Sequence, residues 1–329
     1  MSAVQHKEVS ADEDGMRLDR WFARHFPQLG FGRLQKLIRN GEVRVDKGRV
    51  QTSTRLSPGQ TVRIPPIDDP GAPKPFRANE ADVQFLRDIT LYEDEDIFVF
   101  NKPHGLAVQG GSGTTRHLDG LLKNLPNKKG ETPKLVHRLD RDTSGCLIVA
   151  KTPAAATHFG AVFRSRSARK IYWALVAGNP SPRQGEISCF LAKQATTDGE
   201  QMAVVRNGAP GAVHSSSYYS TTDTASRRFA WVTLKPVTGR THQLRVHMAQ
   251  LGTPIIGDPR YFNIENWQPA PGLGEGLHLH ARRLALPLRN GKKLDISAPL
   301  PPHMRQSFEA LGFDPDRYDV QALDPEDAA

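Results

Sequence analysis

Five charged or titratable side chains stand close together in the segment VHRLDRDTSG (residues 136–145), directly before the apolar run CLIVA at 146–150. An ionised carboxylate beside a core strand costs free energy unless a cation pairs with it. A carboxylate that remains ionised there is suited to act as a nucleophile or as a base. The spacing leaves Asp140 and Asp142 equivalent. It fits a catalytic loop, and equally a turn in which Asp142 accepts backbone N–H groups and an arginine makes a surface ion pair.

A second cluster of cationic and imidazole side chains occurs in TGRTHQLRVHM, residues 238–248. Arg240, His242, Arg245 and His247 give this segment several groups that can contact a phosphate or a carboxylate. His242 and His247 are five residues apart, which places them on different sides of a helix and argues against a helical pair of metal ligands. We therefore interpret the histidines as hydrogen-bonded core positions or as phosphate contacts.

The sequence carries no clear signature of a metal or of a nucleotide cofactor. His278 and His280 are spaced to share one face of a strand, but no acidic or thiol ligand accompanies them at metal spacing. The glycine-rich segment NKPHGLAVQGGSG (101–113) is followed by Thr-Thr-Arg, whereas a phosphate-binding Walker loop requires Lys-Ser or Lys-Thr. We expect neither a metal nor a cofactor, and a histidine-metal hydrolase is the third-ranked hypothesis.

The remaining pattern predicts the elements that position these residues. Apolar runs indicate strands at 97–100, 147–150, 171–176 and 231–234, and residues 242–251 have a helical period. The strands lack a regular alternation with helices, which favours an α+β fold with a mixed, mainly antiparallel sheet. We place this domain at residues 85–312 and a small acidic tail at 313–329.

The first fifth of the chain differs from the rest in charge. The protein has 329 residues and a net charge of +9, whereas residues 15–64 contain 11 Lys or Arg against 3 Asp or Glu and so carry +8. Two amphipathic helices are expected at 17–26 and 31–40, and short strands at 42–46 and 61–64. Positive charge concentrated in this way is typical of a module that binds a polyanion.

Residues 65–80 are predicted to connect this module to the larger domain. Five prolines between 65 and 75 favour a stiff, extended linker. No run approaches the roughly 20 apolar residues of a membrane span, and the first residues lack the apolar core of a signal peptide. Cys146 and Cys189 are too few for a disulfide framework. We therefore expect a cytoplasmic protein with no membrane partner.

Residues 15–64 resemble the small RNA-binding domain of the ribosomal-protein-S-four type. The resemblance rests on two short basic helices followed by GEVRVDKGRV and LSPGQTVRIP. It implies that the second helix and the following turn face RNA phosphates through Arg33, Lys36, Arg39 and Arg44. Cations on one helix face neutralise phosphates and release counterions, which gives affinity without sequence choice.

Four further segments together resemble the RluA family of pseudouridine synthases: HRLDRDTSG, KIYWALVAG, PVTGRTHQLRVHMAQLGTPIIGDPRY and LHLHARRLAL. The N-terminal domain, RIPP and NKPHGLAVQGGSG point to the RluC-like branch. Two departures concern substrate choice: Tyr261-Phe262 in place of Tyr-Gly, and a serine-rich stretch at 214–220. The resemblance implies the pseudouridine synthase fold with a central cleft, and the isomerisation of uridine to pseudouridine in RNA.

The resemblance also implies the roles of individual residues. The essential carboxylate falls on Asp140, which attacks C1′ or removes the 2′ proton, and the sequence leaves both open. Arg245 is the partner that keeps Asp140 ionised, Tyr172 stacks on the uracil, and Leu244 packs against the base. The target nucleotide must leave its stack, and Arg138 fills the vacated space. Further substrate contacts are expected at His137, Arg240 and His242.

The leading hypothesis is thus a monomeric synthase that isomerises uridines in 23S (large-subunit) ribosomal RNA or its precursor. A synthase acting on tRNA or on another ribosomal RNA site is one alternative. A non-catalytic RNA-binding or ribosome-assembly factor is another. In the leading hypothesis Asp142 has a supporting role, either at the turn 143–145 or beside a neighbouring arginine.

Overall fold

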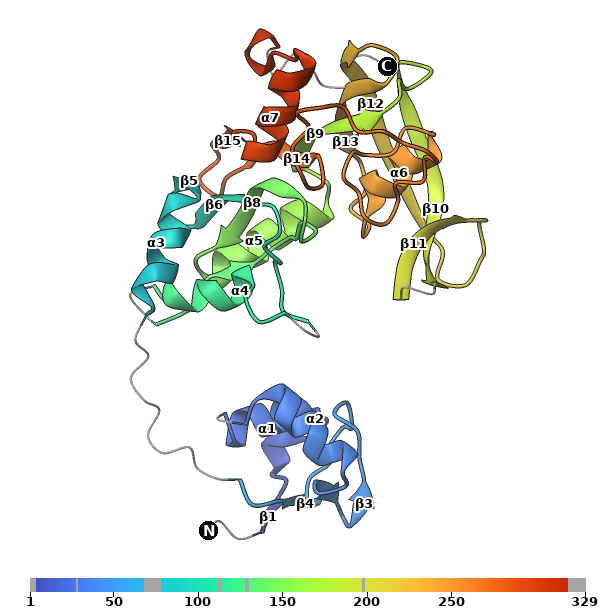
Figure 1. The fold of residues 1–329 in the computed structure, drawn as a ribbon. Helices are drawn as coiled ribbons and strands as arrows, with labels where there is room; N and C mark the ends of the chain where they lie inside the picture. The colour runs from blue at the N-terminus through green and yellow to red at the C-terminus, as the bar shows by residue number, and fades with distance from the viewer. Residues whose placement is uncertain are drawn as a thin grey trace. The chain divides into compact units, whose positions relative to one another are not determined.

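The computed structural model describes residues 4–27, 29–67, 78–111, 114–127, 130–196 and 199–318. The chain divides into two compact units, Met1–Arg77 and Ala78–Ala329, whose helices and strands are labelled in Figure 1. Across the described residues, no helix has the length and apolar character needed to cross a membrane.

The first unit is a four-stranded antiparallel sheet packed against two helices. The strands lie in the order β1 (Gln5–Glu8), β4 (Thr61–Ile64), β2 (Arg44–Val45) and β3 (Gly48–Arg49). The helices are α1 (Leu18–His25) and α2 (Phe31–Arg39), preceded by a 3-10 turn at Ala11–Glu13. The apolar stripes of both helices pack on Val62 and Ile64 of β4, which explains the helical periodicity of this part of the sequence.

This unit begins before residue 15, which corrects the predicted boundary. Strand β1 pairs with β4, and Glu13 is buried beneath α1. Burial acts to raise the pKa of Glu13, but hydrogen bonds with His25 and Trp21 outweigh burial and lower the pKa to about 2. The four side chains of β1 are all exposed, so the sequence has no alternating apolar pattern there.

The predicted linker is too long at both ends. Pro65 is buried and Ile67 packs against the core of the first unit. At the other end, the side chain of Asn79 accepts the N–H of Ala81 and caps α3 (Glu80–Asp88), so the second unit starts before residue 85. The intervening residues 68–77 lie outside the described residues.

The second unit likewise extends past residue 312, where the acidic tail was predicted to start. Phe313 is 5% exposed, and a 3-10 turn at Pro315–Arg317 follows it. The rings of Phe313 and Tyr318 both lie against Trp231. The rest of the predicted tail, 319–329, lies outside the described residues.

A mixed sheet forms the centre of the second unit, and the prediction of a mixed, mainly antiparallel sheet is confirmed. In the described residues its order is β11-β10-β12-β13-β9-β14-β8-β6-β5, with β15 beside β14 and β7 beside β8. Only the β14–β8 pair among these is parallel. The strands are β5 (Thr90–Glu93), β6 (Ile97–Lys102), β7 (Lys134–Leu135), β8 (Ser144–Ala150), β9 (Arg169–Ala177), β10 (Gln184–Thr196), β11 (Gly199–Val205), β12 (Val213–Ala225), β13 (Phe229–Pro236), β14 (Leu279–Pro287) and β15 (Lys293–Ser297).

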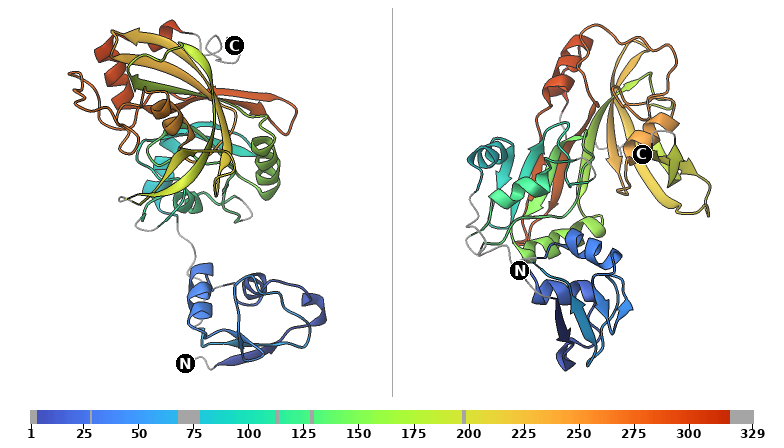
Figure 2. Two further views of the ribbon diagram at one scale, coloured as in Figure 1. Left: turned by 90° about the vertical axis from the view of Figure 1, so that its right-hand side faces the viewer. Right: turned by 60° about the horizontal axis from the view of Figure 1, so that its bottom comes forward.

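Both faces of this sheet are buried at its centre, where helices α3 to α7 and the loops cover it (Figures 1 and 2). Alternate residues of β8 enter two different cores: Cys146 and Ile148 face one, Leu147 and Val149 the other. This two-sided burial explains why β6, β8 and β9 have nearly continuous apolar sequences. The remaining helices are α4 (Leu118–Leu121, continued by a 3-10 turn at Leu122–Asn124), α5 (Pro153–Arg164), α6 (Gln243–Gln250) and α7 (Pro302–Leu311).

The parallel contact between β8 and β14 positions the loop that contains Asp140. Ser144 pairs with His280 and Gly145 with Ala281. Gly145 has φ +107°, and a Cβ atom there would collide with the carbonyl of Ala281. Only glycine permits this approach, so the end of the turn at 143–145 is fixed against β14.

Candidate active site

A cavity of about 530 Å³ opens in the second unit between the loop before β8, the α5–β9 connection, and the segment that leads from β13 into α6. Among the described residues that line it are six cations and one carboxylate: Arg138, Arg164, Arg166, Lys170, Arg240, Arg245 and Asp140. Such an excess of positive charge suits a ligand with several phosphates. The sequence prediction of a central cleft places Asp140, Tyr172 and Arg245 together, and all three line this cavity.

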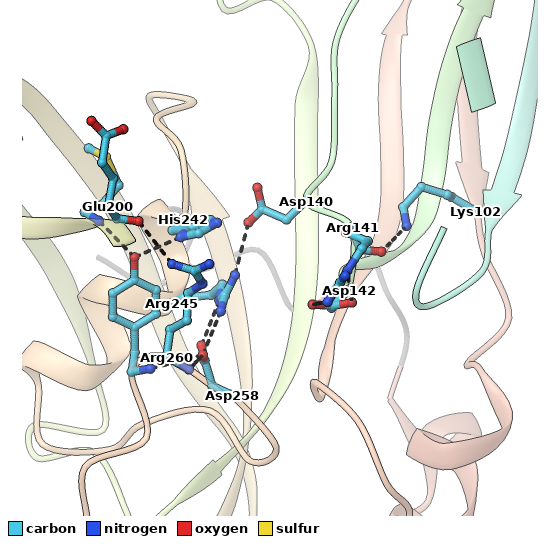
Figure 3. Close-up of polar contacts among 11 residues, drawn as sticks. Lys102, Asp140, Arg141, Asp142, Glu200, His242, Arg245, Asp258 and Arg260 are labelled. Carbon is cyan, nitrogen blue, oxygen red and sulfur yellow. Dashed lines mark hydrogen bonds and ion pairs between the residues drawn. The ribbon is translucent and has the colours of Figure 1, made fainter. Parts of the chain in front are cut away.

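Asp140 lies in the loop between β7 and β8 and reaches into the cavity. Its carbonyl oxygen accepts the N–H of Thr143 at 3.2 Å, which closes the turn, and its side chain is 21% exposed. The nearest cation is Arg245, whose Nη1 lies 3.9 Å from Asp140 Oδ2 (Figure 3). The carboxylate therefore contacts both solvent and a guanidinium.

Arg245 is held chiefly by another carboxylate, Asp258, which the sequence reasoning missed. Its Nε and Nη2 donate to the two oxygens of Asp258 at 2.8 and 2.7 Å. Burial acts to lower the pKa of Arg245, but the hydrogen bonds and charge of Asp258, with the charge of Asp140, raise the pKa above its ordinary value. The bidentate pair fixes the guanidinium plane and leaves Nη1 for Asp140.

Asp258 is itself locked by the chain around it. Its Oδ1 also accepts the backbone N–H groups of Arg260 and Tyr261, at 2.9 and 3.1 Å. The preceding Gly257 has φ +72°, and a Cβ atom there would collide with the carbonyl of Gly276. The signal that could have revealed this residue is an acid placed directly after the apolar run at 254–257.

Tyr172 and Leu244 form an apolar part of the cavity wall. Tyr172 lies on β9, where it packs against two cores of the sheet, and Leu244 lies in the first turn of α6. Burial raises the pKa of Tyr172 above its ordinary value, and the negative charge of Asp140 raises it further. The phenol is therefore neutral at physiological pH and can present its ring to a base.

The other four residues predicted to bind substrate also line the cavity, but they differ in how freely they can reach a ligand. Arg138 and Arg240 are exposed, and Arg240 Nε donates to the carbonyl of His214 at 3.1 Å. His242 is the N-cap of α6 and hydrogen-bonds to Tyr261. His137 is engaged within the fold: its Nε2 accepts the N–H of Ile148 at 2.9 Å and its ring stacks on Phe163.

Three histidines that the sequence singled out are core residues. His247, His278 and His280 are buried, and each hydrogen-bonds to a serine hydroxyl at 2.7–2.9 Å. For His247 the structure thus favours the first of the two interpretations, a hydrogen-bonded core position, and burial lowers its pKa to about 4. Within the described part of the chain, no cluster of three or more His, Cys, Asp or Glu side chains could hold a metal ion.

Comparison with known proteins supports one family. Residues 96–250 match the family model described as RNA pseudouridylate synthase. The chain is 37% identical to ribosomal large subunit pseudouridine synthase C of Yersinia pestis, over 94% of this chain and 96% of that protein. It is 33% identical to the mitochondrial RNA pseudouridine synthase 4 of Arabidopsis thaliana, over 92% of this chain and 80% of that protein.

The chain belongs to the RNA pseudouridine synthases. A solved structure of human RNA pseudouridylate synthase domain containing 4 superposes with a TM-score of 0.61 at 29% identity, and covers 71% of this chain and 98% of its own. The pseudouridine synthase fold expected from the sequence is confirmed, and the synthase isomerises uridine to pseudouridine in RNA.

Lys102 is a second residue of this synthase that sequence reasoning missed. It ends strand β6 and is fully buried, and its Nζ donates to the carbonyls of Pro103, Leu106 and Arg141 at 2.8–2.9 Å. Figure 3 shows it reaching the loop next to Asp140. Burial lowers the pKa of Lys102 to about 7, although the charges of Asp142 and Asp140 act to raise it. The signal available in the sequence was a lysine that follows the apolar run IFVF (97–100) and Asn101.

Asp142 meets a neighbouring arginine, one of the two supporting roles expected for it. Its carboxylate accepts from Arg141 Nε at 3.0 Å, and the Arg141 side chain is 67% exposed. An exposed pair of this kind contributes little stability. Asp142 does not line the cavity, whereas Asp140 does, so the structure separates the two aspartates that spacing alone left equivalent.

Proposed function

We propose that this synthase modifies uridines in large-subunit ribosomal RNA and that Asp140 is its reacting carboxylate. One observation carries the proposal: Asp140 is the carboxylate of an otherwise cationic cavity, and it faces an arginine that Asp258 holds in place. The relatives named ribosomal large subunit pseudouridine synthase C support the choice of RNA.

The reaction breaks the C1′–N1 glycosidic bond, turns the uracil and forms a C1′–C5 bond. C5 then loses its proton and N1 gains one, so the atoms balance with no change of redox state. Asp140 attacks C1′ or removes the 2′ proton, and Arg245 keeps it ionised for either step. Tyr172 stacks on the uracil, Leu244 packs against it, and Arg138 fills the space that the flipped nucleotide leaves. The exposed cations of the cavity rim bind the flanking phosphates.

We further propose that the first unit is an RNA-binding domain of the ribosomal-protein-S-four type. Arg33, Lys36 and Arg39 are exposed on α2, and the exposed Arg44 follows on β2. The side chain of Arg44 donates to the carbonyls of Gly41 and Lys47, which orders the turn beside these cations. Generic phosphate binding by this surface offsets the few kcal/mol that unstacking the target nucleotide costs.

A paired substitution tests the assignment of Asp140. Asp140→Asn should abolish pseudouridine formation on a large-subunit ribosomal RNA transcript while RNA affinity, measured by filter binding, persists. Asp142→Asn is the matched control and should keep substantial activity, because its carboxylate pairs with the exposed Arg141 and does not line the cavity.

Full activity of Asp140→Asn, or an equal loss of activity in both variants, would contradict the assignment. The choice of RNA is tested by mapping pseudouridines in ribosomal RNA and tRNA from a strain that lacks the protein. Loss confined to tRNA would overturn the ribosomal substrate, and an inactive wild type on both RNAs would favour a non-catalytic binding role.

A further inference from the structure

His242 and Tyr261 form a hydrogen-bonded pair at the wall of the cavity. His242 Nδ1 lies 2.8 Å from Tyr261 Oη, and the two rings meet nearly edge to face. His242 has φ +53° and ψ 16°, a left-handed conformation that few non-glycine residues adopt. Such backbone strain persists where the surrounding structure enforces it, and it concentrates at functional sites. The strained residue here is one whose ring lines the cavity.

The direction of this hydrogen bond follows from the second partner of Tyr261. The hydroxyl oxygen of Tyr261 accepts the N–H of Met202 at 3.1 Å, so its own proton needs an acceptor. Among the described residues, the acceptor within hydrogen-bond distance is Nδ1 of His242. Burial raises the pKa of Tyr261, so the hydroxyl keeps this proton at neutral pH. In the neutral imidazole of His242 the remaining proton therefore lies on Nε2.

The imidazole is neutral at physiological pH. Burial lowers the pKa of His242, and among the groups that face it Arg245 and Arg260 act in the same direction, while Asp140 and Asp258 oppose them. In Figure 3 the ring of His242 and the carboxylate of Asp140 point toward each other across the cavity. The Nε2–H edge thus faces the place where the atoms that react with Asp140 must lie.

We propose that His242 is a neutral hydrogen-bond donor whose Nε2–H binds an oxygen of the reacting nucleotide beside Asp140, and that Tyr261 is the positioning residue that selects this tautomer. The inference rests on the proposed function. A protonated imidazole would pair with Asp140 and occupy the reacting carboxylate. A neutral donor leaves Asp140 ionised and can still stabilise negative charge on a uracil carbonyl or bind the ribose hydroxyl.

Two substitutions at His242 distinguish the contribution of its N–H donor from the other effects of losing the ring. In His242→Gln the side-chain amide can place an N–H close to the former Nε2, whereas His242→Leu cannot, and both carry the same left-handed backbone penalty. We expect His242→Leu to lower kcat about 10²-fold, the usual loss for one such donor, with KM little changed, and His242→Gln to recover most of it. Equal activity of the two variants would overturn the proposal.

Tyr261→Phe tests the positioning role through a pH profile. The Tyr261 hydroxyl favours the neutral imidazole, so its removal should raise the pKa of His242 and move the acid limb of kcat to higher pH. Tyr219→Phe is the control, because it removes a buried hydroxyl that donates to Pro182, outside the cavity. A purely structural role of Tyr261 would lower activity without moving the acid limb, and that result would contradict the proposal.

Nitrogen NMR of ¹⁵N-histidine-labelled full-length protein tests the tautomer without an activity assay. The signal absent from His242→Gln identifies His242, and we expect a proton on Nε2 in the wild type and a mixture in Tyr261→Phe. A wild-type proton on Nδ1 would overturn the inference even if the synthase is active on ribosomal RNA. Conversely, the predicted tautomer in a protein inactive on every RNA tested would refute the proposed function alone.

Transcripts with 2′-deoxyuridine, 2-thiouridine or 4-thiouridine at the target identify the accepting oxygen. The loss caused by His242→Leu should shrink on the one analogue that lacks the contacted oxygen, because variant and analogue then remove the same interaction. If the loss caused by His242→Leu and the loss caused by the analogue were fully additive for all three analogues, a contact between His242 and the nucleotide would be contradicted.

Discussion

Arg245 contacts two carboxylates that have different roles. Asp258 binds it at 2.7–2.8 Å and is completely buried, whereas Asp140 lies 3.9 Å away and is partly open to solvent. The close pair offsets the cost of burying the guanidinium, and the looser contact leaves Asp140 free to approach a substrate. At the scale of single residues, the position of Arg245 therefore depends on a buried carboxylate that does not line the cavity.

Asp258→Asn should reduce both stability and catalysis. It leaves the buried guanidinium without its charge partner, so we expect the free energy of unfolding to fall by about 3–5 kcal/mol in urea titrations. It also frees Arg245 to turn toward Asp140. Because Asp140 would then lose its orientation toward the substrate, we expect kcat to fall at least tenfold.

Asp295→Asn is the matched control for this prediction. Asp295 forms a bidentate pair with Arg283 on β14 and β15, where Asp295 is more exposed than Asp258, and neither residue lines the cavity. It should cost stability while leaving kcat near the wild-type value. If Asp258→Asn behaves in the same way, its role is structural only.

The loop between β7 and β8 carries Asp140, the carboxylate that we propose reacts, and contacts on both sides hold this loop in place. Lys102 at the end of β6 binds the carbonyl of Arg141, next to Asp140. On the other side Gly145 lies against Ala281 of β14. The loop is thus placed by two neighbouring strands of the sheet, which limits its motion relative to α6 and Arg245.

Lys102→Met should loosen this loop. Methionine is similar in length but leaves the carbonyls of Pro103, Leu106 and Arg141 without their donor, so we expect roughly 1–3 kcal/mol lower unfolding free energy and reduced kcat. Lys151→Met is the control: Lys151 donates to Glu93 and to the carbonyl of Asp94 at the opposite end of β6 and β8. Thermal unfolding and single-turnover rates measure the two effects. Equal loss of kcat in both variants would exclude a specific role for Lys102.

At the scale of the whole molecule, positive charge is divided between two places with different geometry. In the first unit it lies on an exposed helix face, and in the second it surrounds a cavity. The first arrangement is open to any phosphate backbone, whereas the second can admit only a short stretch of chain. We expect affinity and catalysis to be separable between the units.

Lys36→Ala with Arg39→Ala should weaken RNA binding without changing kcat at saturating RNA. Each lost phosphate contact lowers the slope of log affinity against log salt by roughly 1, so the double variant should lower it by roughly 2. Lys292→Ala with Lys293→Ala, at the exposed start of β15, makes the same change in net charge and is the control. Fluorescence titrations at several salt concentrations measure the slope. An unchanged slope would refute RNA binding by α2.

Much of the fold follows from local pattern. The helices at 18–25 and 31–39 and the strands around 97–102, 144–150, 169–177 and 229–236 were predicted because their apolar residues have a clear period or run. Strand β1 and the long strands β10 to β12 were not, because their buried and exposed residues lack a sustained apolar alternation. The predicted ends of the second unit, residues 85 and 312, were wrong. The true start depends on a polar cap at Asn79, and the unit continues past 312 because the aromatic side chain of Phe313 is buried.

The sequence by itself predicted the chemistry that we propose for this protein. The prediction came from the grouping of His, Arg and Asp before an apolar strand, from the basic first unit, and from the resemblance that singles out Asp140, Tyr172 and Arg245. Only the tertiary structure placed Asp140 in the cavity and Asp142 outside it, gave Arg245 its partner Asp258, and joined His242 to Tyr261. These relations link residues from 13 to more than 100 positions apart. Their geometry depends on how strands and loops pack, which local sequence patterns do not encode.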